Sequence, residues 1–337
     1  MTGPAPVSFT VDPWDPGYGV AFGEDPDGGQ EASSAELNLD LEVPAAQWRP
    51  LDPGPALPLP GTVLFLDGVR RIDARVWVHA ATPQPAAGIA ASYAAGLVSC
   101  DGAARISAVT VERGLFTSAA GATGITASCA SYPARVAAGP AFEQLSLALQ
   151  QRLTTAEVQL AVAYRAQNPG SDDLLVVDGP LRGRTHLGRI VGYIKTHHAS
   201  YLPVEQAAVV SALKPGQRTP AFTMGTSWRR NSWYLQLPGT AGAPWSGVVR
   251  AECSPDLPTA EVSRLADLTA RLLPPLASTP HKDPRAPQNL VPIGGLEREL
   301  RRRLGDRHVL YRALRAAAAR PPQTARRVSG HFSGTRG

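Results

Sequence analysis

The sequence has no apolar run near the ~20 residues that a membrane-spanning helix needs, and its first residues lack the basic and apolar regions of a signal peptide. Its three cysteines, Cys100, Cys129 and Cys253, are odd in number and too far apart for a zinc knuckle. This pattern favours free thiols in a reducing compartment over a disulfide framework. We therefore expect a soluble, cytoplasmic protein that makes no contact with a membrane.

Several catalytic signatures are missing as well. The stretch Gly121-Ala122-Thr123-Gly124 lacks the lysine of a phosphate-binding loop, so we do not expect this chain to hydrolyse ATP by itself. The sequence contains no Gly-x-Ser-x-Gly nucleophile elbow, and its seven histidines are not spaced as zinc ligands. These absences argue against a serine hydrolase and a zinc enzyme.

Lysine is scarce, with Lys195, Lys214 and Lys282 the only examples, so the net charge of +5 comes mostly from arginine. Acidic residues gather between positions 12 and 42, whereas arginines dominate from position 285 onward. The C-terminal part is therefore the one that attracts a polyanion. Arginine suits bidentate phosphate contacts, but a GC-rich genome gives the same preference for arginine over lysine.

Two apolar stretches end in an aspartate and a glycine. They are Val63-Leu64-Phe65-Leu66-Asp67-Gly68 and Leu174-Leu175-Val176-Val177-Asp178-Gly179. Each predicts a buried strand that ends at its carboxylate, with the glycine turning the chain away. A carboxylate at the end of a buried strand needs a compensating charge, which an arginine or a divalent metal supplies. An aspartate before a glycine is also a common turn former.

The order of predicted elements indicates the fold. Strands are expected at 63–67, 71–78 and 105–112, followed by a helix from 142 to the break at 168–170 and a strand at 174–178. This is the order of an RNase H-like α/β core, a mixed sheet flanked by helices. We expect this domain to span 61–319 and to end in a basic helix at 296–319. An acidic appendage rich in proline and glycine, with an edge strand at 36–43, precedes it at 1–60, and a disordered basic tail follows at 320–337.

Glu157 lies on the predicted helix and completes a set of three carboxylates. Two-metal phosphodiester hydrolysis needs such a set to hold two cations about 4 Å apart. In this interpretation Asp67 bridges both ions, Asp178 holds one and Glu157 completes the other. A glutamate on a helix is more commonly a solvated charge. Glu157 is assigned as a metal ligand only because of the order of the predicted strands and helix.

Several motifs resemble those of the NurA nuclease domain, in the order that this family shows them. They are Phe65-Leu66-Asp67-Gly68, Val177-Asp178-Gly179-Pro180-Leu181, Gly192-Tyr193-Ile194-Lys195-Thr196, Arg218-Thr219-Pro220-Ala221-Phe222, Ser232-Trp233-Tyr234-Leu235 and Pro287-Gln288-Asn289-Leu290. The resemblance covers about Gly61 to Arg315. It implies an RNase H-like deoxyribonuclease that uses two Mn²⁺ or Mg²⁺ ions, as a 5′–3′ exonuclease, a single-strand endonuclease or both. It also implies a homodimer that acts with the HerA hexameric ATPase in DNA end resection and repair.

One position departs from the family pattern. Many members carry a histidine shortly after the C-terminal motif, where this chain has Val291-Pro292-Ile293-Gly294-Gly295. Gln288, Asn289 or a water substitutes for that ligand, or the enzyme is slower or inactive. The alternative function is therefore a catalytically impaired NurA-like module that binds DNA or a partner without cutting.

Basic and aromatic residues near the two aspartates are candidates for DNA contact. Lys195 follows an apolar strand and is a candidate catalytic residue that contacts the scissile phosphate, although a solvated lysine fits the pattern equally well. The guanidinium groups are expected to make salt-sensitive phosphate contacts, or else to pair with the acids. Tryptophan can stack on bases, but it more commonly lies in a core. The candidate nucleic-acid contacts are Arg70, Arg71, Arg182, Arg184, His197 and Trp233.

Overall fold

The computed structural model describes residues 8–11, 31–32, 36–54, 57–79, 84–195, 199–225, 228–239 and 245–319. The strands are β1 (Ser8–Val11), β2 (Glu31–Ala32), β3 (Glu36–Asn38), β4 (Thr62–His79), β5 (Ala86–Cys100), β6 (Ala104–Thr117), β7 (Ile125–Thr126), β8 (Ser131–Tyr132), β9 (Ala134–Val136), β10 (Asp173–Asp178), β11 (Ile190–Ile194), β12 (Ala199–Ser200), β13 (Phe222–Gly225), β14 (Arg229–Gln236) and β15 (Val248–Cys253). The helices are η2 (Ala45–Gln47), α1 (Phe142–Gln167), α2 (Val204–Ser211), α3 (Thr259–Leu272), η3 (Pro274–Leu276), α4 (Val291–Arg303) and α5 (Arg307–Ala318). The tail expected at 320–337 lies outside the described residues.

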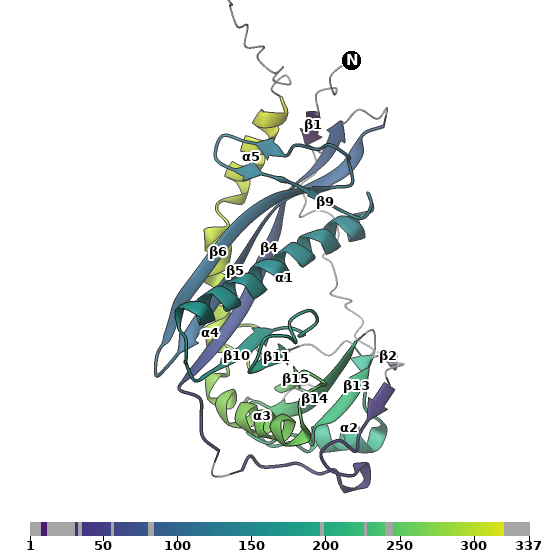
Figure 1. The fold of residues 1–337 in the computed structure, drawn as a ribbon, viewed down its shortest axis with the longest axis vertical. Helices are drawn as coiled ribbons and strands as arrows, with labels where there is room; N and C mark the ends of the chain where they lie inside the picture. Colours follow the sequence, from purple (N-terminus) through teal and green to yellow (C-terminus); the bar gives the residue numbers. More distant parts are fainter. Residues whose placement is uncertain are drawn as a thin grey trace, which may run out of the picture.

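One large mixed sheet organises the chain, flanked by helices on both faces (Figure 1). Within the described ranges it has eleven strands in the order β3-β13-β14-β15-β11-β10-β4-β5-β6-β9, and β1 pairs with β4. Strands β4, β5 and β6 are antiparallel and form a long arm. Helix α1 then leads to β10, which lies parallel to both β4 and β11.

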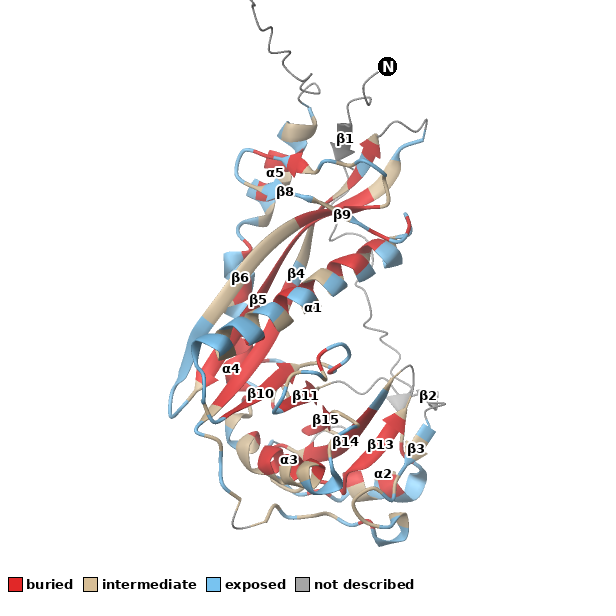
Figure 2. Cartoon of the chain, in the orientation of Figure 1, coloured by how far each residue is buried: buried red, intermediate tan, exposed pale blue. Residues whose placement is uncertain are grey.

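Strand β5 is buried along almost its whole length, so the arm is covered on both faces (Figure 2). Many of its side chains are small. Its residues alternate between a cluster that contains α1 and a cluster that contains α4. Ala95 faces α1, while Ala94 faces α4. At Gly96 an added Cβ would lie 2.6 Å from Leu296 Cδ1 of α4, so only glycine allows this helix to come so close. Helices on both faces explain why this strand reads as a continuous apolar run.

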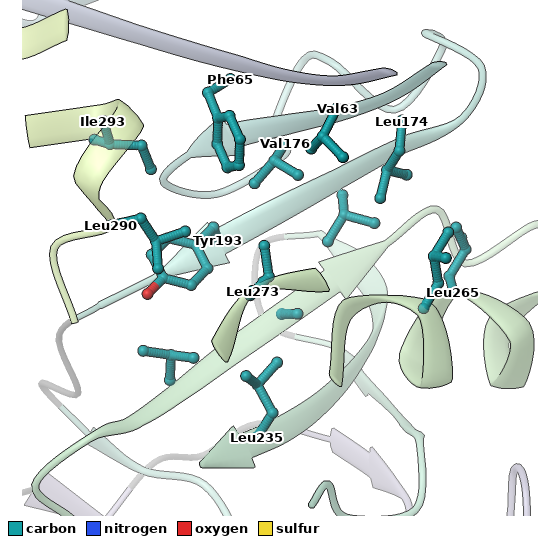
Figure 3. Close-up of a cluster of buried hydrophobic side chains, with 14 of the residues drawn as sticks. Val63, Phe65, Leu174, Val176, Tyr193, Leu235, Leu265, Leu273, Leu290 and Ile293 are labelled. Atoms are coloured by element: carbon teal, nitrogen blue, oxygen red, sulfur yellow. The ribbon is translucent and has the colours of Figure 1, made fainter. Parts of the chain in front are cut away.

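The core on the α3 and α4 face joins the two halves of the sheet (Figure 3). Phe65 of β4, Val176 of β10 and Tyr193 of β11 are buried together with Leu290 and Ile293 at the start of α4. The Tyr193 hydroxyl donates to the Gln288 carbonyl at 2.6 Å. The segment that leads into α4 is therefore fixed to the strand beside Asp178.

Several local predictions are confirmed. The helix expected from residue 142 is α1, which ends at Gln167 just before the predicted break. The strand expected at 174–178 is β10, and the third strand expected at 105–112 lies within β6. None of the helices in the described ranges combines the length and the apolarity that crossing a bilayer requires.

Other predictions were wrong. The strands expected at 63–67 and 71–78 are one strand, β4, which runs through Asp67-Gly68 and bends only at a bulge between Ile72 and Ala74. The second antiparallel strand is instead β5. The basic helix expected at 296–319 is two helices, α4 and α5, because Gly305 adopts a φ of +85° between them. The edge strand expected at 36–43 is shorter and ends at Asn38.

Candidate functional site

Asp67 lies within β4 rather than at its end. Its register partner on β5 is Gly96, and the pairing continues through Gly68 and Val69. The strand does not turn after Asp67 because β5 is long enough to pair with β4 on both sides of this point. The carboxylate is therefore held by a rigid strand and is only 7% exposed.

Asp178 ends β10 beside Asp67. In the parallel pairing of β10 with β4, Val177 lies opposite Leu66, so the next residue on each strand is an aspartate. Both carboxylates point to the α4 face, since Phe65 and Val176, two residues before each, belong to the core on that side. The predicted meeting of the two acids is thus confirmed by the register.

The two carboxylates are in an unfavourable electrostatic environment. Burial, and after it the charge of Asp178, holds the pKa of Asp67 well above its usual range, against the opposing effects of Lys195 and the Gly68 N–H. Burial also raises the pKa of Asp178, although Lys195 acts in the opposite direction. Within the described ranges Asp67 has no ion pair, and its recorded hydrogen bond is from Gly68 N to Oδ1 at 2.7 Å. A cation placed at this pair would favour the ionised forms.

Lys195 connects Asp178 to the C-terminal segment. Its Nζ donates to Asp178 Oδ2 at 2.6 Å and to Asn289 Oδ1 at 3.0 Å. Asn289 is fully buried, and its Nδ2 donates to Asp283 Oδ2 at 2.6 Å. Asn289 thus comes from 94 residues further along the chain to orient the lysine. The NurA-like Pro-Gln-Asn-Leu motif was the sequence signal for it, whereas nothing local indicated Asp283.

Glu157 approaches β4 from the opposite side. An added Cβ at Gly68 would lie 2.5 Å from Glu157 Oε1 and 2.7 Å from Leu153 Cδ1, so Gly68 faces α1. Asp67 faces α4, because successive side chains on a strand alternate. Within the described ranges no group of three or more metal-ligating side chains stands ready to hold an ion. The single three-carboxylate cluster expected from the sequence is therefore a pair, Asp67 and Asp178, with Glu157 as a neighbour across the strand.

Arg184 holds Glu157 in place. The two side chains are ion-paired and buried, and Arg184 also donates to the Pro180 carbonyl at 2.8 Å. Burial raises the pKa of Glu157, Arg184 lowers it, and Asp178 raises it further, so the net direction is upward. Arg184 is therefore an internal counter-ion, and its assignment as a DNA contact was wrong.

The assignment of Trp233 as a nucleic-acid contact was wrong, and Arg71 has the alternative role expected from the sequence, pairing with an acid. Trp233 is 0% exposed, and its Nε1 donates to Thr269 Oγ1 at 2.9 Å, so it belongs to the core. Arg71 pairs with buried Asp73 at 2.8 Å and donates to the Gly305 carbonyl at 2.8 Å, which fastens β4 to the α4–α5 connection. Trp233 was misassigned because a sequence does not show which face of a strand is covered.

The remaining candidates are on the surface or outside the described residues. Arg70 is exposed and makes one long contact, from Nη1 to the Ser146 carbonyl at 3.4 Å. Arg182 is exposed in the loop after β10. His197 lies outside the described residues. Arg70 and Arg182 are thus free to meet a polyanion, and their role stays a prediction.

We expect Gly68→Ala to destabilise the protein. The new methyl group would collide with Glu157 Oε1 and Leu153, so α1 would have to move away from β4. The expected loss of unfolding free energy is about 1–3 kcal/mol, measured by urea denaturation. Gly188→Ala is the matched control, because an added Cβ there meets nothing within 4 Å, and it should change stability by less than about 0.5 kcal/mol. Equal stability of both variants would contradict the close approach of α1.

No protein-family model matches the chain, and a search of curated proteins finds no match either. The assignment of a function therefore depends on the side chains themselves. The site offers carboxylate oxygens, a lysine held beside them and a buried amide. Such groups can bind a hard divalent cation and a phosphate together.

Proposed function

We propose that this chain is a metal-dependent DNA nuclease that hydrolyses phosphodiester bonds. The observation that carries the proposal is the pair of aspartates on adjacent parallel strands, buried Asp67 and partly buried Asp178. Each raises the free energy of the other's ionised form, an arrangement that a purely structural role does not require. Unfavourable carboxylate pairs of this kind are concentrated at functional sites.

The topology supports an RNase H-like core. Strands β6, β5 and β4 are consecutive and antiparallel, and a helical connection leads to β10 beside β4, with β11 next in order. In an RNase H-like fold the first and fourth strands carry the metal-binding acids, which correspond here to Asp67 and Asp178. The ordered NurA-like motifs are the second, independent support.

The donor set fits a hard divalent cation, Mn²⁺ or Mg²⁺, at Asp67 and Asp178. Such an ion would supply a Lewis acid for the phosphate and lower the pKa of a bound water. A second ion would need Glu157, whose carboxylate Arg184 holds on the other side of β4. A second ion would therefore require Glu157 to give up its ion pair with Arg184.

Lys195 and Asn289 have defined roles in this proposal. The ammonium group of Lys195 lies between Asp178 and Asn289, where it can donate to an oxygen of the scissile phosphate and offset its charge. Asn289 orients the lysine from the α4 side and is a positioning residue. Because Asn289 is buried and Asp178 is partly buried, these charge-assisted contacts are stronger than they would be in water.

The biological setting is proposed from the resemblance alone. We infer DNA end processing and repair with a HerA-like hexameric ATPase, by a homodimer in the cytoplasm. Exposed Arg70 and Arg182, close in sequence to the two aspartates, are the candidate phosphate contacts.

One observation favours the alternative, a catalytically impaired module that binds DNA or a partner. Glu157 and Asp178 each have a cation partner within the protein, Arg184 and Lys195. These internal cations already compensate the two negative charges, so the two carboxylates do not require a metal for charge balance. Asp67 has no such partner within the described ranges. Substitution of Asp67 therefore distinguishes the nuclease from the binding module.

The test is degradation of end-labelled single- and double-stranded DNA in Mn²⁺, Mg²⁺ or EDTA at several pH values. The nuclease should cut with Mn²⁺ and not with EDTA. Because protons compete with the metal at carboxylates whose pKa is raised, the Mn²⁺ concentration for half-maximal cutting should fall by up to about ten-fold per pH unit as pH rises toward that pKa. Cutting that persists in EDTA would contradict the metal site, and DNA binding without cutting would favour the module.

A further inference from the structure

A cavity of about 340 Å³ opens at the start of α4 and has a strongly basic lining. Its charged residues are Lys282, Asp283, Arg285, Glu297, Arg298 and Arg301. Four of these are cations and two are acids. The volume lies within the ~300–1,000 Å³ typical of small-ligand sites. These six residues surround the basic cavity.

The two acids of the basic cavity are already compensated. Glu297 is ion-paired with Arg285 and, at 2.8 Å, with Arg301, and these partners lower its pKa despite its burial. Asp283 accepts hydrogen bonds from Asn289 Nδ2 at 2.6 Å and Arg285 N at 2.8 Å. In contrast, no ion pair or hydrogen bond of the Lys282 or Arg298 side chain is recorded within the described ranges. Two positive charges are thus in surplus.

A glycine keeps the basic cavity open. An added Cβ at Gly294 would lie 3.0 Å from Asn289 Nδ2, 3.1 Å from Asp283 Oδ2 and 3.8 Å from Arg298 Nη1. Any side chain at this position would fill the space between the cations and Asn289. The unpaired Arg298 guanidinium therefore lies next to the bare backbone of Gly294.

The basic cavity is connected to the aspartate pair. Asn289 contacts Asp283 on the cavity side and Lys195 on the aspartate side, and Lys195 contacts Asp178. The charges of Glu297 and Arg285 also act on the pKa of Asp178, in opposite directions. The basic cavity and the aspartate pair are thus joined by one chain of hydrogen bonds through Asn289.

We propose that the basic cavity binds a phosphate monoester, namely the terminal phosphate of a DNA strand or a free phosphate or nucleoside monophosphate; this inference rests on the proposed nuclease function. A monoester carries about two negative charges near neutral pH, which matches the two surplus cations. A diester within the strand carries only one. The site would therefore distinguish a phosphorylated strand end from a hydroxyl end.

The test compares the binding of oligonucleotides with a 5′-phosphate, a 3′-phosphate or hydroxyl ends to the full-length protein in EDTA, where the nuclease does not cut. A terminal phosphate should strengthen binding at least about ten-fold, the size of one charge-assisted contact at the low end of its range. The double variant Lys282→Gln, Arg298→Gln should lose this advantage. Arg302→Gln is the matched control, because it removes one charge from α4 at a residue that pairs with Glu299 outside the basic cavity. It should keep the advantage.

Competition distinguishes the source of the phosphate. Displacement of the phosphorylated oligonucleotide by inorganic phosphate or deoxyadenosine monophosphate at micromolar concentration supports a free monoester, and resistance to both supports a strand end. Equal binding of phosphate and hydroxyl ends by the wild type would overturn the proposal. So would an advantage that survives in the double variant.

Failure of this site and failure of the nuclease are distinguishable. If the protein binds phosphorylated ends more tightly in EDTA but never cuts with Mn²⁺, the phosphate site is supported and the nuclease function is contradicted. If the protein cuts with Mn²⁺ but binds phosphate and hydroxyl ends with equal affinity, only the phosphate site is contradicted.

Discussion

Asp67→Asn is expected to abolish Mn²⁺-dependent cutting and, at the same time, to stabilise the metal-free protein. A neutral amide cannot replace the carboxylate as a ligand of a hard cation, so the rate should fall at least about a hundred-fold. The measurement is degradation of end-labelled DNA, with Asp178→Asn as a second variant of the same pair. Both substitutions keep the shape of the side chain, which limits changes in packing.

The gain in stability follows from the sign of the pKa shift. Because the pKa of Asp67 is higher in the folded than in the unfolded chain, the folded state is penalised as pH rises from the unfolded value through the raised one. Asparagine removes this penalty at neutral pH, so the unfolding free energy in EDTA should rise by about 1 kcal/mol. Mn²⁺ should then stabilise the wild type but not the variant.

Asp256→Asn is the control, since this aspartate is exposed and distant in sequence from the site. It should change neither cutting nor stability. An Asp67→Asn protein that cuts as fast as the wild type would reject the metal site. An Asp67→Asn protein that is less stable than the wild type in EDTA would show that the carboxylate has a structural role instead.

The parts of the site that the sequence predicts well are those defined by local patterns. A run of apolar residues ending at Asp178 has the length of one buried strand, and β10 ends there. The helical period from Phe142 predicts α1 up to its last turn. Lys195 follows directly from the next apolar run and reaches Asp178 because β10 and β11 are neighbours.

The parts that could not be predicted depend on partners distant in the chain. Whether Asp67-Gly68 turns or continues is decided by β5, whose small residues do not resemble a strand in isolation. The same pairing decides that Asp67 faces α4 while Gly68 faces α1 and Glu157. A periodic pattern places residues on a face of their own element, but it does not show what covers that face.

Arg218→Met is expected to cause a larger loss of stability than Gly68→Ala or Asp67→Asn. The Arg218 side chain is 3% exposed and donates from Nη1 and Nη2 to the Glu42 carboxylate, both at 2.8 Å, and from Nε to Asp267 at 2.7 Å. These bonds join the N-terminal segment to α3. Methionine fills a similar volume but leaves two partly buried carboxylates without their cation, which typically costs about 3–5 kcal/mol.

The loss caused by Arg218→Met should depend on pH. Burial alone would raise the pKa of Glu42, but the hydrogen bond and charge of Arg218 outweigh it and lower the pKa. In the wild type Glu42 therefore contributes stability above its unfolded pKa, and this is lost as pH falls through the lowered folded value. The variant loses the lowering effect of Arg218, so this contribution of Glu42 to stability above its unfolded pKa is reduced. The stability gap between the two proteins should be largest at neutral pH and narrow toward pH 4.

Urea denaturation at pH 7 and near pH 4 measures both effects. Arg302→Met is the control, because this arginine is highly exposed and pairs with Glu299 on the surface of α4, where its removal should change stability very little. A loss below about 1 kcal/mol for Arg218→Met at pH 7 would contradict the buried network. A gap of constant size at both pH values would show that packing, rather than the two carboxylates, accounts for the loss.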